Sequence, residues 1–194
     1  TALIQQARCT TVAAPSQATD QAMSGAFAAV DRNPATGWIA SGDDRDPTLA
    51  VRWETPQEIS GIQVSTSPGL VAATATALVI DFGNGQSRSV TLRDGRAAFD
   101  PVTASRATVR FVKHDKATTL SLDGQTGRAL PVGVSELTFT GAPLDSRPLS
   151  IAEPDRACGS GPDIRLDGIV TETRLHASPA QLYQGDTVSA EPCE

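Results

Sequence analysis

Three oxygen-bearing side chains lie within six residues of one another near the start of the chain: Asp31, Asn33 and Thr36. Pro34 and Gly37 restrict the backbone beside them to a tight, non-repetitive path. Ca²⁺ takes about six to eight hard oxygen ligands, and such a loop turns side-chain and carbonyl oxygens inward. The segment therefore predicts a calcium site, and the alternative is a metal-free turn closed by its own side-chain hydrogen bonds.

A second polar cluster, Gly42-Asp43-Asp44-Arg45-Asp46, places three acids and an arginine in a predicted loop. These groups have the chemistry to ligate a cation or sugar hydroxyls, and the alternative is a solvated loop. A hydrolase would need paired carboxylates that face a cleft, and this loop holds the only dense acids of the chain. We interpret it as a surface loop.

The pair His114-Asp115 follows a predicted strand at 107–112, but no serine or cysteine motif accompanies it. Adjacent residues on a strand point to opposite faces, which does not suit a catalytic dyad. His176 stands alone, and the sequence has no phosphate-binding glycine loop, nucleophile elbow or HExxH motif. We therefore predict that this segment is not an enzyme.

The composition excludes several kinds of partner. The net charge of −6 and the pI near 4.9 argue against nucleic acid and against an anionic membrane surface. No apolar run approaches the ~20 residues of a membrane helix, and the start, TALIQQARC, lacks the layout of a signal peptide. The expectation is a mature or excised segment, with any membrane anchor outside it.

Three cysteines are present: Cys9, Cys158 and Cys193. None forms a CxxC pair and no histidine cluster is near, which disfavours zinc. Cys158 and Cys193 bracket the C-terminal segment, so we predict a disulfide between them that contributes roughly 3–4 kcal/mol. Cys9 is then either buried and free or paired in a parent protein. A disulfide implies an oxidising, extracytoplasmic compartment.

These side chains must be positioned by strands, because the chain shows short alternating runs and almost no helical periodicity. Asn84-Gly85, Asp94-Gly95 and Asp123-Gly124 mark turns between them. The pattern predicts an antiparallel, jelly-roll-like β-sandwich. The expected strands are 49–54, 60–66, 77–82, 88–92, 107–112 and 135–141.

The chain divides into three parts by composition. We predict a sandwich over residues 1–141, a proline-rich linker over 142–155, and a small disulfide-closed β appendage over 156–194. In the appendage, Asp167-Gly168 lies at the centre of a hairpin pattern. The appendage is too small to hold a core without the disulfide or packing against the first domain.

Residues 8–141 resemble the discoidin, or galactose-binding-like, family of carbohydrate-binding β-sandwiches. The matching residues of an early loop and the following turn are Ala29, Asp31, Asn33, Thr36, Trp38, Pro56, Ile59, Gly61 and Ile62, and those of the last core strand are Gly133, Val134, Glu136 and Leu137. Many members hold a structural calcium ion at this loop. The resemblance implies calcium ligands at Asp31, Asn33, Thr36 and Glu136, with a backbone carbonyl near Ala28. Arg32 stands where the family usually has glycine.

The resemblance also bears on the two tryptophans, which have the chemistry of sugar-stacking platforms. It places Trp38 in the core and Trp53 at a core aliphatic position. The frequent tryptophan of relatives at the position of Thr48 is absent. With only eight aromatic residues in the chain, ligand-binding residues stay unassigned.

A second resemblance covers the whole chain. A discoidin module followed by C-G-x-G-P-x-I-x-L-D-G and a closing P-C is similar to the extracytoplasmic region of large actinobacterial arabinofuranosyltransferases, which build cell-wall arabinan. The matching residues are Cys158, Gly159, Gly161, Pro162, Ile164, Leu166, Asp167, Gly168, Pro192 and Cys193.

Together these patterns predict a non-catalytic carbohydrate-binding module of a larger, membrane-tethered cell-envelope protein, located in the periplasm or at the cell surface. The resemblance implies two partners, a cell-wall polysaccharide such as arabinan and the rest of the parent polypeptide. The alternative is a structural spacer or protein-interaction domain without a glycan ligand, because a fold does not fix a function.

Overall fold

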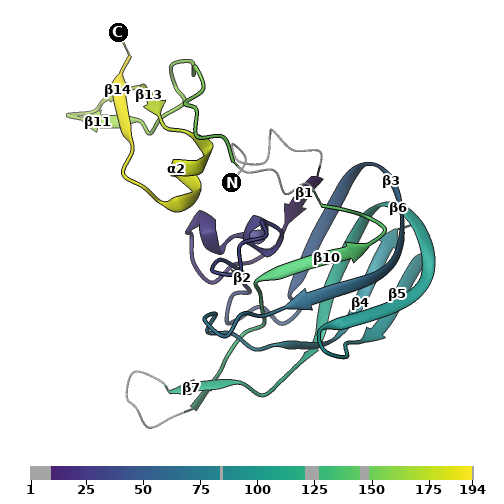
Figure 1. The fold of residues 1–194 in the computed structure, drawn as a ribbon. Helices are drawn as coiled ribbons and strands as arrows, with labels where there is room; N and C mark the ends of the chain where they lie inside the picture. The colour runs from purple at the N-terminus through teal and green to yellow at the C-terminus, as the bar shows by residue number, and fades with distance from the viewer. Residues whose placement is uncertain (1–9, 84, 121–126, 145–148, 194) are drawn as a thin grey trace. The chain divides into compact units, whose positions relative to one another are not determined.

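The computed structural model describes residues 10–83, 85–120, 127–144 and 149–193 (Figure 1). Cys9, Asn84 and the pair Asp123-Gly124 lie outside the described residues. The chain divides into two compact units, and the boundary in the sequence falls between residues 146 and 147, inside the segment expected as a linker. In the described residues no helix is long and apolar enough to cross a membrane.

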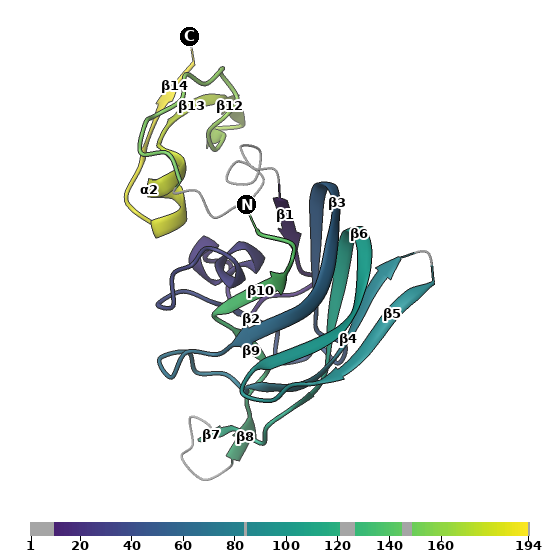
Figure 2. The same cartoon turned by 45° about the vertical axis from the view of Figure 1, so that its right-hand side comes forward.

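The first unit is built on one six-stranded antiparallel sheet (Figures 1 and 2). The strand order is β1-β3-β6-β4-β5, and β10 also pairs with β3. The strands are β1 (Thr10–Ala13), β3 (Thr48–Ser65), β4 (Ala75–Gly83), β5 (Gln86–Thr91), β6 (Arg96–His114) and β10 (Glu136–Thr140). The predicted antiparallel jelly-roll-like sandwich is confirmed.

The long strands β3 and β6 allow this one sheet to form both layers. The first part of β3 pairs with β1 through residues 50–53, and its last part pairs with β10 through residues 61–65. Between them, the register with β6 shifts after Arg52 and resumes at Gln57, and such a bulge bends a strand. The sequence predicted two strands here, whereas the structure has one. Pro56 lies within the register shift, where the strand pairing requires no backbone N–H donor.

Short elements close the rest of the unit. They are η1 (Ala22–Ser24), η2 (Ala26–Ala29), the pair β2 (Trp38–Ile39) and β9 (Gly133–Val134), and the pair β7 (Thr118–Leu120) and β8 (Gly127–Ala129). The β7–β8 pair projects from one end of the sandwich (Figure 2). The Asp94-Gly95 turn between β5 and β6 has φ of 50° and 74°, as a type I′ turn requires.

The core lies between the layers and contains alternate residues of the long strands. Trp38 is fully buried and packs on Phe111 with 5.6 Å between ring centroids. Trp53 is 6% exposed and packs edge-on against Phe139 at 5.1 Å. Both tryptophans therefore pack as the discoidin resemblance implies. Other fully buried side chains include Leu49, Ile59, Ile62, Leu78, Ile80 and Leu137.

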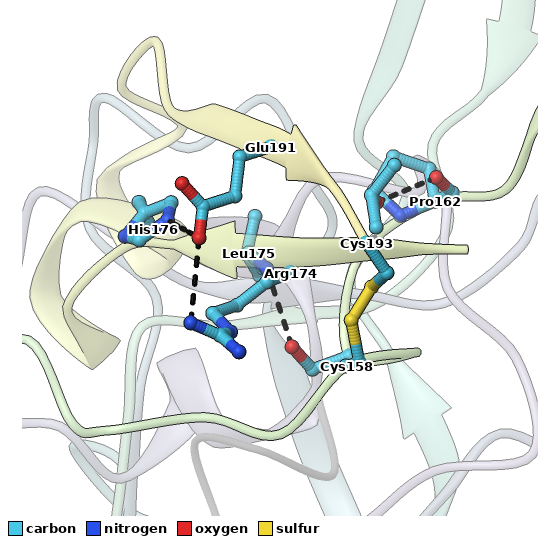
Figure 3. Close-up of a disulfide and its surroundings, with 9 residues drawn as sticks. Cys158, Pro162, Arg174, Leu175, His176, Glu191 and Cys193 are labelled. Carbon is cyan, nitrogen blue, oxygen red and sulfur yellow. Dashed lines mark hydrogen bonds and ion pairs between the residues drawn. A yellow bond between two sulfur atoms is a disulfide. The ribbon is translucent and has the colours of Figure 1, made fainter. Parts of the chain in front are cut away.

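The second unit contains two hairpins and a short helix. Strands β11 (Ile164–Leu166) and β12 (Ile169–Thr171) pair around the Asp167-Gly168 turn, with φ of 48° and 82°, and β13 (Thr173–His176) pairs with β14 (Ser189–Pro192). The predicted Cys158–Cys193 disulfide is confirmed, with 6.0 Å between the Cα atoms (Figure 3).

The second unit also contains a helix that the sequence analysis did not predict, α2 (Pro179–Gln184). Ser178 caps the helix: its hydroxyl accepts from the Gln181 N–H, and the Gln181 side chain accepts from the Ser178 N–H at 2.9 Å. Proline at the first helical position and glycine at the left-handed end complete the pattern of a helix with defined ends. This signal was present in the sequence.

Candidate functional site

The loop of Asp31, Asn33 and Thr36 is a compact turn held by its own side chains. The Asp31 carboxylate accepts from the Asn33 N–H at 2.9 Å and from the Thr36 hydroxyl at 2.7 Å. The Asn33 side-chain oxygen accepts from the Ala35 N–H at 3.1 Å. The turn thus gathers the three predicted oxygen-bearing side chains on a stretch of six residues.

Arg32 connects this turn to the last strand of the sandwich. Its φ is 61°, a left-handed conformation that costs a non-glycine residue roughly 1–2 kcal/mol. In this conformation its N–H donates to the Glu136 carboxylate of β10, 104 residues away in the sequence. Arg32 therefore adopts the backbone geometry for which relatives use glycine, and it brings Glu136 to the loop.

Glu136 is half-buried, and burial raises the pKa of its carboxyl group to about 7. The hydrogen bond from the Arg32 N–H lowers that pKa, and the negative charge of Asp31 raises it further. Among the described residues no salt bridge joins Glu136 to a basic side chain. Two carboxylates thus lie near each other, and the positive charge of Arg32 offsets part of the effect of Asp31 on the pKa of Glu136.

The donor set at this corner fits a calcium ion. Two carboxylates, an amide oxygen and a hydroxyl are hard oxygen ligands, and Ala28 lies three residues before Asp31 at the buried end of η2. In the described part of the chain, no three His, Cys, Asp or Glu side chains gather as a metal site, so a cation here would rely on neutral oxygens. The metal-free alternative also remains consistent with the structure, because hydrogen bonds from its own side chains close the turn.

The acidic loop at 41–46 is ordered by hydrogen bonds from serines. The Ser41 hydroxyl donates to Asp43, and the Ser16 hydroxyl donates to Asp44. The Ser41 hydrogen bond lowers the pKa of the exposed Asp43, whereas a general acid needs a raised pKa. The loop offers ionised carboxylates and hydroxyls, which suit hydrogen bonding to a ligand better than acid catalysis.

Two arginines border the same loop. The Arg110 Nε lies 3.8 Å from a carboxylate oxygen of Asp46. Gly42 faces Arg128 of β8 so closely that a Cβ atom at position 42 would lie 3.0 Å from its guanidinium. Acceptors and donors of hydrogen bonds therefore alternate over a short distance at this end of the sandwich.

The pair His114-Asp115 does not form a dyad. The Asp115 carboxylate accepts from the Thr74 N–H at 3.0 Å, and the His114 Nδ1 contacts the Asp115 backbone oxygen at 2.8 Å. The carboxylate therefore anchors the start of β4 and does not orient the imidazole.

No exposed aromatic platform accompanies these polar groups. All eight aromatic residues lie in the described part of the chain. Seven of them are buried, and Phe99 is half-buried. Sugars that stack on aromatic rings need an exposed face, so a ligand here would be held by polar groups alone.

A family model described as "Arabinofuranosyltransferase D, third carbohydrate binding module" matches residues 7–151. The chain belongs to this family. It is a carbohydrate-binding module, and the segment is non-catalytic. The membership confirms the prediction from the discoidin and arabinofuranosyltransferase resemblances.

Two curated relatives carry the name alpha-(1→3)-arabinofuranosyltransferase. The protein of Mycolicibacterium smegmatis is 28% identical over 188 residues, and that of Mycobacterium tuberculosis is 27% identical over 184 residues. Each alignment covers 87% of this chain and 13% of the relative. The chain thus spans about an eighth of the length of these proteins.

Solved structures show the same fold. The structure of arabinofuranosyltransferase AftD from mycobacteria matches this chain with a TM-score of 0.79 and 23% sequence identity. The match covers all of this chain and 16% of the AftD chain. A second match is a family 32 carbohydrate-binding module from Clostridium perfringens, solved in complex with GalNAc-β-1,3-galactose, with a TM-score of 0.52 and 13% sequence identity. This match covers 67% of this chain and 94% of the module.

Proposed function

We propose that this module binds arabinan of a bacterial cell wall and holds it near the catalytic part of a parent arabinofuranosyltransferase. Family membership over residues 7–151 is the observation that carries the proposal. The names of the two mycobacterial relatives point to arabinose polymers as the glycan. The Cys158–Cys193 disulfide suits an oxidising, extracytoplasmic location.

We further propose that the glycan lies against the 41–46 loop and Arg128. Ionised carboxylates of this loop accept hydrogen bonds from sugar hydroxyls, and the arginine donates to them. Without an exposed aromatic ring the affinity of one contact is weak. Attachment of the module to the enzyme compensates for this, because a tethered site raises the effective concentration of the polymer.

Calcium is the cofactor we propose for the corner of Asp31 and Glu136. Asn33, Thr36 and a backbone carbonyl near Ala28 complete its shell. The ion would place a positive charge beside the two carboxylates. Since Glu136 pairs with Ser65 at the end of β3, the filled site would brace the loop that begins at the next residue.

The test is binding of arabinan fragments to the 194-residue chain, first on a glycan array and then by calorimetry with galactan fragments as the comparison. Arg128→Ala and Asp44→Asn should each weaken arabinan binding by ~10-fold, since each removes a charged hydrogen-bond partner. Arg165→Ala, in exposed strand β11 of the second unit, is the control and should not change it.

The alternative is a spacer or protein-interaction domain without a glycan, and the lack of an exposed aromatic favours it. No binding of any arabinan fragment at millimolar concentration, by protein shown to be folded, would support the spacer and reject arabinan as the ligand.

A further inference from the structure

A cavity of about 360 Å³ lies beside the bends of β3 and β6. Trp53, Phe82 and Ala104 supply its apolar lining, and its polar lining includes Arg52 and Arg106. In the β4–β6 ladder, Ala75 pairs with His114 at one end and Asp81 with Thr108 near the other. The cavity is at the second end, because Phe82 and Arg106 are among the residues that line it.

The two arginines are directly opposite each other. Arg52 and Arg106 are Cα partners in the β3–β6 ladder, and like charges at opposed positions destabilise a sheet. Both are exposed, and neither has a hydrogen bond or ion pair within the described residues. No aspartate or glutamate lines the cavity, although the chain carries a net charge of −6. The pair is a concentrated positive charge for which the described residues provide no counterion.

The structure holds one of these guanidinium groups in place. A Cβ atom built at Gly83 would lie 2.6 Å from the Arg106 Nε, so the guanidinium rests on the backbone of the β4–β5 hairpin. Gly83 has a φ of 81°, which further disfavours any side chain there. A guanidinium packed on backbone loses less freedom when it binds a ligand.

Trp53, one of the residues that line the cavity, carries a hydrogen-bond donor that the fold leaves without a partner among the described residues. Its side chain is 6% exposed, and its indole N–H has no hydrogen-bond partner among the described residues. Buried donors are nearly always paired. By contrast, the Trp38 indole N–H donates to the Ser16 carbonyl oxygen at 2.8 Å.

We propose that this cavity binds one anionic group, a carboxylate or a phosphate, carried on a sugar ring. Planar guanidinium groups bind both anions through paired hydrogen bonds. The volume is at the small end of ligand pockets, which suits a single ring, and Gln86, Thr103 and Ser105 offer partners to ring hydroxyls. The site is separate from the arabinan site proposed above and does not depend on it.

The two tryptophans allow a direct test by two-dimensional ¹H–¹⁵N NMR of the whole chain. Glucuronate and glucose 6-phosphate should shift the Trp53 indole signal saturably, and glucose should bind at least ~10-fold more weakly. The Trp38 signal is the internal control and should stay unchanged. Arg52→Gln and Arg106→Gln should each weaken binding of the sugar acids ~10-fold or more, whereas Arg165→Gln should not.

Each other outcome would reject the proposal. Inorganic phosphate that binds as tightly as both sugar acids would indicate a simple anion site without recognition of the ring. An acidic peptide that binds more tightly would indicate a protein partner. A Trp53 signal that does not move at ligand concentrations of roughly 50 mM, the range of very weak sites, would show that the site does not exist. Binding by both arginine variants as tight as binding by the wild type would show the same. Melting curves of the two arginine variants test whether they fold. Their melting temperatures should equal or exceed that of the wild type, because the repulsion between the two like charges is relieved.

Discussion

Glu136 illustrates how one side chain links charge, metal and stability. Its carboxylate is brought beside Asp31 by the left-handed backbone of Arg32. In calcium-free protein the ionised form of Glu136 is disfavoured, first by burial of its carboxyl group and to a lesser extent by the negative charge of Asp31. A bound cation would reverse this effect and turn the same pair into a stabilising shell.

We therefore predict that calcium raises the melting temperature and that a chelator lowers it. At about 100 times the dissociation constant, calcium would add about 2.7 kcal/mol to the free energy of unfolding. Glu136→Gln should abolish this response. In calcium-free protein the same variant should be more stable than wild type by ~1 kcal/mol, after allowance for solvent screening. Differential scanning calorimetry with and without chelator measures both effects.

Equal melting curves in chelator and in calcium, for wild-type protein shown to be metal-free at the start, would leave the turn closed by Asp31 and Asn33 as the full explanation of the loop. Arg165→Gln is a control for loss of a surface charge and should keep the calcium response.

His176 gives the second unit a pH-dependent contact. Its Nδ1 lies 2.6 Å from the Glu153 carboxylate. Its Nε2 lies 3.3 Å from the Glu191 carboxylate, which also pairs with Arg174 (Figure 3). The hydrogen bond with Glu153, followed by that with Glu191, raises the pKa of His176 above its usual value of 6.5. Only the protonated imidazole can donate to both carboxylates.

The stabilisation by His176 should therefore be complete below pH 6.5 and be lost as pH rises through the raised pKa of the folded state. We predict that the second unit becomes easier to cleave by a protease between neutral and mildly alkaline pH. His176→Gln should remove this dependence. An NMR titration of His176 that gives a pKa at or below 6.5 would contradict the prediction.

At the scale of elements, two glycines with the same backbone angle differ in their surroundings. Gly85 and Gly95 both have a φ of 74°. A Cβ atom at Gly85 would meet no other atom within 4 Å, whereas one at Gly95 would run into the Val64 carbonyl oxygen. The Gly95 oxygen also accepts from the Val64 N–H at 2.8 Å, so the β5–β6 turn is fastened to β3.

Gly85→Ala should therefore cost only the left-handed penalty of about 1–2 kcal/mol. Gly95→Ala should cost about 3 kcal/mol or more, because the turn must also move away from β3. Chemical denaturation of the two variants gives the difference directly. Equal losses would mean that the β5–β6 turn is not held by Val64.

The elements that the sequence predicted well are those whose signal is local. Alternation located the strands, and Asp94-Gly95 and Asp167-Gly168 form turns at the predicted positions. The continuous β3 was missed because Pro56 normally interrupts a strand, and the bulge that admits it depends on the partner strand β6. The helix after Ser178 was missed although its capping residues were visible.

The candidate site was predictable only in part. The Asp31–Thr36 turn is a local sequence pattern. That Glu136 lies beside this turn was inferred only from the family resemblance, and the structure shows the contact, a hydrogen bond from the Arg32 N–H to the Glu136 carboxylate. The opposition of Arg52 and Arg106 has no local signal at all, because it depends on the register of two strands that are distant in sequence. Long-range register is what alternation cannot supply.

At the scale of the whole molecule, the two units should differ in what holds them together. The first unit has a continuous core, whereas the second has few buried side chains, Tyr183 among them, and a disulfide that spans 35 residues. Closing a loop of this length is worth about 4 kcal/mol in the chain-entropy model.

Reduction should therefore unfold the second unit while the first keeps its β structure. Hydrogen exchange measured by mass spectrometry should show fast exchange over residues 149–193 only, and the double variant Cys158→Ser/Cys193→Ser should behave in the same way. Peptide mapping without reduction should recover the two cysteine peptides joined. Retained protection of the second unit after reduction would show that its packing suffices without the bridge.

The pairing of β10 with the far part of β3 has a consequence for how the protein is made. The edge of β3 at residues 61–65 receives its partner only from residues 136–140, and the contact between Arg32 and Glu136 joins positions 104 residues apart. A nascent chain that has emerged only to β8 would carry an open strand edge, which is prone to wrong pairing. Such distant contacts also slow folding. Folding of this module should therefore be a late, nearly all-or-none event that waits until residues 136–140 have emerged.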